Sequence, residues 1–130
     1  MGWDAVSKLD IRPANPDIAV GNLSGGNQQK IVLGKWLMHD TEMLLVDEPT
    51  VGIDVGAKDE IYKLLRELSE NGVAIIIVSS DLHELVSISN RILVFRKGRI
   101  FREFNEGSVT EEEILMAASG IDNTMECSNE

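Results

Sequence analysis

The sequence has one cysteine, few aromatic residues and no apolar stretch that could cross a membrane. The single Cys127 excludes an internal disulfide. His39 and His83 lie far apart, and neither has the spacing of metal ligands. The longest apolar run, residues 73–78, is far shorter than the about 20 residues of a membrane-spanning helix. The first ten residues include acids and lack an apolar segment, which excludes a secretory signal peptide and predicts a cytoplasmic chain.

Positive charge is missing from the end of the chain. Eight acids and no Lys or Arg follow Arg102, so residues 103–130 carry −8 of the net charge of −10. The first 102 residues are nearly neutral, with 14 acids and 12 bases. Nucleic-acid binding requires a basic face, so we expect no nucleic-acid partner. The acidic end is typical of a solvated segment that aids solubility. With 130 residues, the chain has room for one domain with its own core.

Prolines and helical periodicity divide the first forty residues. The segment "IRPANPD" contains two prolines, so residues 1–20 are expected to be irregular. A helical pattern follows over residues 27–39. Its expected apolar face consists of Leu33, Trp36 and Leu37, and its lysines, which are expected to face water, are Lys30 and Lys35.

A strand, a helix and a second strand are predicted next. Short apolar runs at residues 43–47 and 73–78 are typical of buried strands. Between them, positions at helical spacing form an apolar stripe: Ile61, Leu64, Leu65 and Leu68. Asp54 suits the N-cap of this helix, and Gly72 suits the left-handed position after it. The short connections predict parallel strands joined by a right-handed crossover.

The C-terminal part is predicted to contain two capped helices that flank a hairpin. Capping-box spacing marks helix starts at Asp81-Glu84 and Thr110-Glu113. Two strand-like runs meet at Lys97-Gly98, which predicts a tight hairpin. The last helix is expected to end near Ala118, and the polar, acidic residues 119–130 are expected to be disordered.

Two adjacent acids follow the first predicted strand. The crevice beyond the carboxyl ends of parallel strands is where open α/β sheets bind ligands. Side chains of adjacent strand residues point in opposite directions, so Asp47 and Glu48 can take different chemical roles. One carboxylate can hold hydrated Mg²⁺ and the other can polarise an attacking water. The same pattern also fits an acidic turn that ends a strand.

The segment "NLSGGNQQK" suggests a phosphate contact at a helix start. Gly25 and Gly26 allow the backbone to approach an anion closely, and Ser24 adds a hydroxyl. A helix N-terminus adds exposed N–H groups and the positive end of the helix dipole. By itself this pattern is more often an ordinary N-cap. The 130 residues contain no G-x-x-x-x-G-K-[ST] phosphate-binding loop.

Four motifs in order give the chain a family resemblance. "LSGGNQQK", "LLVDEPT", "VGIDVGAK" and "IIIVSSDLHEL" resemble the C-terminal half of an ATP-binding cassette (ABC) ATPase domain. The variants "NQQK" and "GIDVGAK" resemble the second cassette of bacterial monosaccharide importers. The resemblance covers roughly residues 18–118. It implies an α/β fold of the P-loop NTPase type, with parallel strands, a crossover helix, and a C-terminal hairpin and helix.

The resemblance implies a role for each matching residue. The signature loop, which contacts the γ-phosphate of ATP held by a second cassette, is matched by Ser24, Gly25, Gly26 and Asn27. Asp47 matches the acid that orients Mg²⁺ through water, and Glu48 matches the acid that positions the hydrolytic water. The loop that crosses the dimer interface is matched by residues 51–54 and ends at Asp54. Implied partners are another cassette and the permease subunits of a sugar importer, at the inner face of the membrane.

Two positions depart from the family pattern. Ser80 stands at the place of the switch histidine, and a serine cannot carry positive charge to a developing phosphate anion. His83 lies in the next helix and is expected to point elsewhere. We therefore expect a slow or inactive composite site in the parent dimer. Val51 stands where related cassettes tend to carry arginine, which weakens the polar contacts of the crossing loop.

The phosphate loop, the adenine-stacking aromatic and the glutamine loop of such cassettes precede the signature, and none is visible in this chain. Trp3 is expected to be a packing or tail residue. We therefore expect ATP and Mg²⁺ in the intact parent and no tight ATP binding by the isolated chain. The lacking segment supplies further strands in the family, so an open sheet edge is expected to favour self-association.

Residues 1–118 are thus interpreted as a truncated ABC ATPase domain of a sugar importer. Two alternatives remain open at this point. One is a non-catalytic interaction module that completes the ATP site of another cassette. The other is part of a soluble DNA-maintenance ATPase, which would show coiled-coil insertions and a basic surface.

Overall fold

The computed structural model describes residues 2–37, 39–105, 107 and 109–121. It divides into two compact units, residues 1–78 and 79–130, and each is described by itself. Within the described residues, no helix combines the length and the apolar character that a membrane crossing requires.

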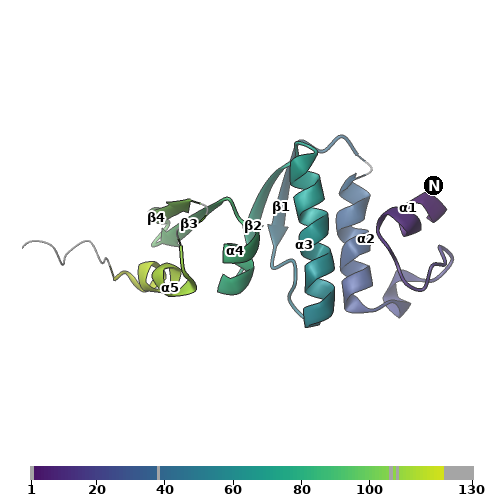
Figure 1. Ribbon diagram of the computed structural model, residues 1–130, viewed down its shortest axis with the longest axis horizontal. Coiled ribbons are helices and arrows are strands. Elements are labelled where there is room, and N and C mark those ends of the chain that lie inside the picture. The colour runs from purple at the N-terminus through teal and green to yellow at the C-terminus, as the bar shows by residue number, and fades with distance from the viewer. Residues whose placement is uncertain (1, 38, 106, 108, 122–130) are drawn as a thin grey trace, which may run out of the picture. The chain divides into compact units, whose positions relative to one another are not determined.

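The first unit places helices against a parallel pair of strands (Figure 1). In chain order its elements are α1 (Gly2–Lys8), the 3-10 turn η1 (Val20–Asn22), α2 (Gly25–Leu37), β1 (Met43–Asp47), α3 (Val55–Glu70) and β2 (Ala74–Val78). The strands pair in parallel from Met43 opposite Ala74 to Asp47 opposite Val78. The predicted parallel strand pair and its connecting helix are confirmed.

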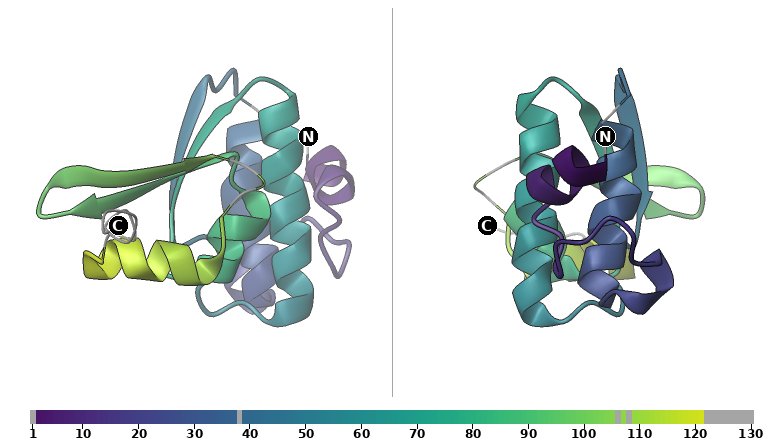
Figure 2. Two further views of the ribbon diagram at one scale, coloured as in Figure 1. Left: turned by 60° about the vertical axis from the view of Figure 1, so that its left-hand side comes forward. Right: turned by 90° about the vertical axis from the view of Figure 1, so that its right-hand side faces the viewer.

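The core of the first unit lies between α3 and one face of this sheet. Leu44 and Val46 of β1 are buried, as expected for alternate residues of a strand with one covered face. All four predicted stripe positions of α3 are buried: Ile61, Leu64, Leu65 and Leu68. Figure 2 shows α2 alongside α3. The amphipathic pattern of the sequence therefore identified the correct face of α3.

The other face of the β1–β2 sheet is apolar and exposed. Its four large side chains are 50–68% exposed: Met43, Leu45, Ile76 and Val78. They alternate with the covered residues and face the same way, because strands paired in register carry matching residues on the same face. Asp47 lies at the carboxyl end of the same face.

Three predictions about the first forty residues are wrong. Residues 2–8 form helix α1, although an irregular segment was expected. Both prolines lie after residue 10, so they leave this stretch free to form a helix. Lys30, expected to face water, is only 5% exposed, and Trp36, expected in the apolar face, is 41% exposed. Lys35 stacks its ammonium 4.9 Å from the Trp36 ring.

The second unit is a β-hairpin packed with two helices. Its elements are α4 (Leu82–Ile88), β3 (Arg91–Arg96), β4 (Arg99–Asn105) and α5 (Glu111–Ser119). Lys97 and Gly98 form the predicted turn, with φ of 49° and 76°. The left view of Figure 2 shows α5 running along the hairpin. The buried core between them consists of Ile92, Val94, Phe104, Ile114 and Ala117.

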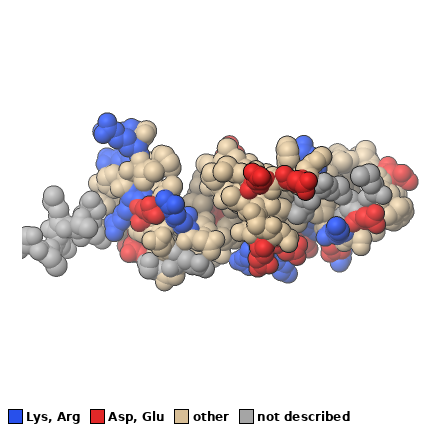
Figure 3. Space-filling model, turned by 90° about the horizontal axis from the view of Figure 1, so that it is seen from above, with Lys and Arg blue, Asp and Glu red and all other residues tan. Residues whose placement is uncertain are grey.

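Positive charge gathers on this hairpin (Figure 3). Its cations are Arg91, Arg96, Lys97, Arg99 and Arg102, five of the twelve in the chain. The guanidinium of Arg91 pairs with Glu103 at 2.7 Å, and that of Arg102 lies 5.0 Å from the Phe104 ring. The net charge alone did not reveal this local concentration.

The predicted helix ends are largely confirmed. The Asp54 carboxylate accepts a hydrogen bond from the Ala57 amide, and Asp81 caps α4 in the same way. Thr110 and Glu113 form a complete capping box at α5. Gly72 has a φ of 92°, as its position after α3 requires. The prediction of disorder falls largely on residues 122–130, which lie outside the described residues.

Candidate functional site

Ser24 is the N-cap of α2. Its carbonyl accepts the first helical hydrogen bond from the Gln28 amide at 2.9 Å. Its hydroxyl oxygen accepts from the Asn27 amide at 3.4 Å and from the Asn27 side-chain nitrogen at 3.0 Å. Ser24 is exposed, while the preceding Leu23 is buried and anchors the loop. The N-cap predicted as the ordinary role of this serine is therefore present, and the hydroxyl also faces solvent.

The two glycines after Ser24 pack against the start of α3. A side-chain carbon added to Gly26 would lie 2.7 Å from the Ala57 side chain, which is closer than real carbons approach. One added to Gly25 would lie 3.4 Å from the Ile53 side chain. The small residues thus let the start of α2 contact the segment from Ile53 to Ala57. This contact joins two motifs that lie some thirty residues apart in the sequence.

The two candidate acids stand where β1 ends. Asp47 is the last strand residue and is exposed. Glu48 follows in the left-handed region, with a φ of 47°, a conformation that is uncommon for residues other than glycine. Its amide donates to the Val78 carbonyl at 2.8 Å, which holds it beside the end of β2. Such backbone conformations persist where surrounding contacts enforce them, and they are frequent at functional sites.

The turn after Glu48 is firmly anchored. Pro49 and Thr50 are both buried, and the Val51 and Ile53 amides donate to carbonyls within the turn. The chain then reaches Asp54, which caps α3. The acids and the crossing loop are therefore held by one continuous, well-packed segment.

The candidate groups of the first unit gather at one end of it. Figure 1 shows the starts of α2 and α3 at the same end as the carboxyl end of β1. This end therefore combines two helix N-termini, whose exposed N–H groups favour anions, with two carboxylates. A phosphate ester with a hydrated divalent cation needs both kinds of group.

The residues at this end fit a hydrated Mg²⁺ that is shared with phosphate. Mg²⁺ keeps several waters and takes one or two carboxylates together with phosphate oxygens. The exposed Asp47 is suitably placed at a strand end. In the described part of the chain, no cluster of three or more potential ligands forms an all-protein metal cage.

Ser80 and His83 belong to the second unit. Ser80 is exposed and precedes the N-cap of α4, where the Ser79 hydroxyl accepts from the Asp81 amide at 3.0 Å. The His83 ring lies 3.2 Å from the Glu111 carboxylate of α5. This contact occupies one ring nitrogen of His83 within its own unit.

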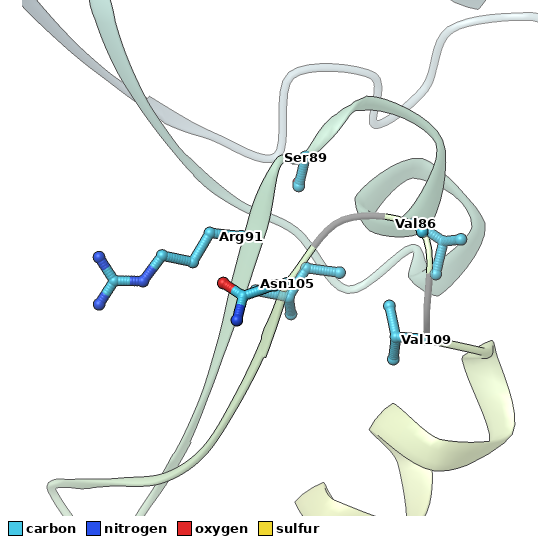
Figure 4. A pocket seen from close by; sticks show the side chains of 7 residues that line it. Val86, Ser89, Arg91, Asn105 and Val109 are labelled. Carbon is cyan, nitrogen blue, oxygen red and sulfur yellow. The ribbon is translucent and has the colours of Figure 1, made fainter.

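A small pocket also lies within the second unit (Figure 4). Its volume is about 190 Å³, and Val86 and Val109 line part of it. Ligand sites for small molecules usually reach at least about 300 Å³. In Figure 4 the Arg91 side chain points away from this space, so no charged group among the labelled residues points into it.

Sequence patterns did not reveal the contacts that support the signature loop. Lys30 donates from its ammonium to the Asp10 carbonyl at 3.0 Å and pairs with Glu60. Asn27 contacts the Arg12 main chain through both ends of its side-chain amide. The polar residues that follow the signature glycines were the one sequence signal for these contacts. A polar side chain on the inner side of a helix needs a hydrogen-bond partner.

Comparisons with known proteins agree with this arrangement. A family model described as ABC transporter matches residues 3–51. The ribose import ATP-binding protein RbsA of Clostridium perfringens (strain SM101) is 52% identical over 118 residues, which span 91% of this chain and 24% of that protein. The xylose import ATP-binding protein XylG of Moorella thermoacetica is 55% identical over 115 residues, 88% of this chain and 23% of that protein. The chain thus spans about a quarter of the length of these relatives.

A solved structure gives the same result for the fold. The ATP-binding cassette MJ1267 of an ABC transporter matches with a TM-score of 0.72 and 26% identity, over 91% of this chain and 45% of that chain. The predicted α/β cassette fold is confirmed. The chain therefore corresponds to a portion of an ABC transporter ATPase domain, and it is close to the ribose import ATP-binding proteins.

Proposed function

We propose that this chain is the C-terminal portion of the ATP-binding subunit of a sugar ABC importer, with residues 1–118 as the cassette portion and 119–130 as its tail. The importer hydrolyses ATP to drive sugar uptake, and its cassettes act with membrane permease subunits at the inner face of the cell membrane. The relatives named for ribose and xylose import support this substrate class. They also favour the importer over a DNA-maintenance ATPase.

The contact between the signature glycines and the start of α3 carries the proposal. Ser24, Gly25 and Gly26 offer a hydroxyl and helix N-terminal amides to a γ-phosphate held by a second cassette. The crossing loop, ending at Asp54, packs beside them through the contact of Gly25 with Ile53. A chain with this geometry completes an ATP site whose phosphate loop belongs to its partner.

Asp47 and Glu48 serve the other composite site of the proposed dimer. Asp47 would hold a water of the Mg²⁺ shell, and Glu48 would orient the attacking water. When bound, Mg²⁺ neutralises charge on the phosphate oxygens. By the resemblance of its motif, Ser80 matches the switch position of such cassettes, where a serine can donate one hydrogen bond without a positive charge. We therefore propose that this composite site hydrolyses ATP slowly.

A hybrid protein tests the proposal. The matching segment of the C. perfringens ribose import ATP-binding protein is replaced by this chain, and ATP hydrolysis is measured with its permease. We expect the hybrid to retain hydrolysis and the Ser24→Ala variant to lose about 10²-fold or more, the usual cost of one preorganised donor. Ser80→His is expected to raise hydrolysis at the slow site.

The control is Asn22→Ala, two residues before the signature serine. Full activity of the Ser24→Ala hybrid would contradict the proposed role of the signature loop. A hybrid that binds its permease yet hydrolyses ATP independently of Ser24 and Glu48 would favour the non-catalytic interaction module.

A further inference from the structure

The Ser24 hydroxyl has a defined donor direction because Asn27 occupies its acceptor sites. A hydroxyl oxygen accepts through two lone pairs and donates one hydrogen. Both hydrogen bonds that the Ser24 hydroxyl accepts come from Asn27, through its amide at 3.4 Å and its side-chain nitrogen at 3.0 Å. The hydroxyl hydrogen is thus the group that Ser24 has left to offer to a ligand, and a ligand that it can bind must be an acceptor.

The side-chain orientation of Asn27 is itself fixed. Its nitrogen donates to the Arg12 carbonyl at 2.8 Å as well as to Ser24. Its oxygen accepts from the Arg12 amide at 3.4 Å. A flipped amide would bring its oxygen against the Arg12 carbonyl and its nitrogen against the Arg12 amide, so the two contacts with Arg12 admit one orientation.

Lys30 in turn holds the segment that contains Arg12. Its ammonium donates to the Asp10 carbonyl at 3.0 Å and pairs with Glu60 of α3. At 5% exposure, Lys30 is buried beneath this segment, and losing a buried charge-assisted hydrogen bond is costly. The Asp10 carboxylate also pairs with the Arg12 guanidinium at 3.1 Å.

Apolar packing fixes the same segment from the other side. Leu9 and Ile11 are both buried, at 9% and 4% exposure. Leu9 occupies the space where Gly34 of α2 lacks a side chain. Residues 9–12 are therefore attached to α2 by an apolar contact near its middle and by polar contacts near its start.

We propose that Asn27 is a positioning residue that fixes the Ser24 hydroxyl as a donor toward a phosphate oxygen, and that residues 10–12, held by Lys30, fix Asn27. The inference rests on the proposed function, because it assigns to Ser24 the phosphate contact of the signature loop. It adds that this contact depends on a chain segment about twelve residues before the serine. Asn27 thereby acts on the phosphate through Ser24.

The Ser24 side-chain rotamer tests the first link without any nucleotide. Three-bond couplings of Ser24 are measured by NMR in the full 130-residue chain. We expect couplings of a single rotamer in the unaltered chain and averaged couplings in Asn27→Ala. In Asn27→Asp the hydroxyl is expected to donate to the new carboxylate, which keeps one rotamer but removes the free donor. Asn22→Ala is the matched control and should leave Ser24 unchanged.

Lys30 tests the second link. Lys30→Met removes the ammonium and keeps most of the side-chain length, so we expect faster amide exchange at residues 10–12 and averaged Ser24 couplings. Lys30→Arg retains the charge and donors and is expected to restore much of the order. Unchanged Ser24 couplings in Lys30→Met would overturn this link, and unchanged couplings in Asn27→Ala would overturn the proposal as a whole.

The hybrid ATPase separates a positioning role from a general structural one. If Asn27 acts through Ser24, Asn27→Asp and Ser24→Ala each lower hydrolysis, and the double variant loses little more than either alone. Multiplying losses would overturn the positioning role. If Ser24→Ala has no effect on hydrolysis while the NMR results hold, the proposed function fails and the positioning of the hydroxyl stands.

Discussion

At the scale of single residues, short side chains determine how closely α2, which begins with the signature loop, approaches α3. Gly26 and Ala57 are in close contact, with no room for another carbon atom. Both lie in helices, so neither can relieve a clash by rotating its backbone. The sequence predicted both glycines as signature-loop residues that contact a phosphate. It did not predict that Gly26 is also required for packing, because Ala57 becomes its neighbour only in the folded unit.

Gly26→Ala is expected to destabilise the chain by about 1–3 kcal/mol, the usual cost of overpacking. Ala57→Gly in the same chain should recover part of that loss, because it removes the atom that the new side chain meets. Denaturant unfolding followed by circular dichroism gives the free energies of unfolding. Gly21→Ala is the control, since nothing lies within 4 Å of its added carbon. Equal destabilisation in the single and double variants would contradict the contact.

At the scale of elements, residues a few positions apart predict the helix caps, whereas contacts between distant residues leave no local signal. The caps at Asp54 and Thr110 depend on residues three positions apart, so the sequence displays them directly. The burial of Lys30 depends on Asp10, twenty residues away, and no local pattern reveals such a partner. Helix α1 was not predicted, because both prolines of this stretch follow it and do not act on residues 2–8.

The capping box of α5 makes its stability depend on pH. Hydrogen bonds from the Thr110 backbone, and then from its hydroxyl, lower the pKa of Glu113 from the usual 4.5. A carboxylate with a lowered pKa stabilises the folded state above its unfolded pKa, and that contribution is lost as the pH falls through the folded pKa. The contribution should therefore be complete at pH 7, begin to decline near pH 4.5, and be lost once the pH is below the lowered pKa of the folded state.

Glu113→Gln is expected to lower the free energy of unfolding at pH 7, with the difference from the unaltered chain shrinking toward pH 3. Urea unfolding across this range measures it. Glu112→Gln removes a carboxylate from the same turn without breaking the capping box and serves as the control. A difference that stays constant with pH would rule out the ionised capping contact.

At the scale of the whole molecule, the β1–β2 sheet leaves four large apolar side chains in water. The short apolar runs predicted buried strands, whereas the structure leaves alternate residues of β1 and β2 exposed on one face of the sheet. Tertiary contacts within the second unit determine the positions of Ser80 and of the β3–β4 hairpin. Sequence patterns gave its elements but not its basic surface, because charge on a hairpin gathers only when its strands pair.

We expect the chain to associate with itself through this apolar face. The exposed side chains of Met43, Leu45, Ile76 and Val78 form an apolar surface, and exposed apolar patches of this kind mark interaction sites. Sedimentation velocity should reveal concentration-dependent association that Leu45→Lys reduces. Val55→Lys, at an apolar residue that is 82% exposed outside this face, is the control. A monomer at every concentration would contradict the expectation.

Isothermal titration is expected to detect no micromolar binding of Mg-ATP to this chain. The chain contains the two acids and the signature loop. Its sequence contains no phosphate-loop pattern that would supply the lysine and the backbone donors for the nucleotide. The hybrid protein, which regains a phosphate loop, is the positive control. Micromolar binding by the chain alone would reveal a nucleotide site that the signature and acids cannot explain.

The packing of Gly26 on Ala57 has a mechanical consequence. Because the two helix starts meet with no room for another carbon, we expect them to move together when either is displaced. Under the proposed function, a displacement of the loop at residues 51–54 would then shift the signature serine. A change at one phosphate site would in this way alter the contact made with the other.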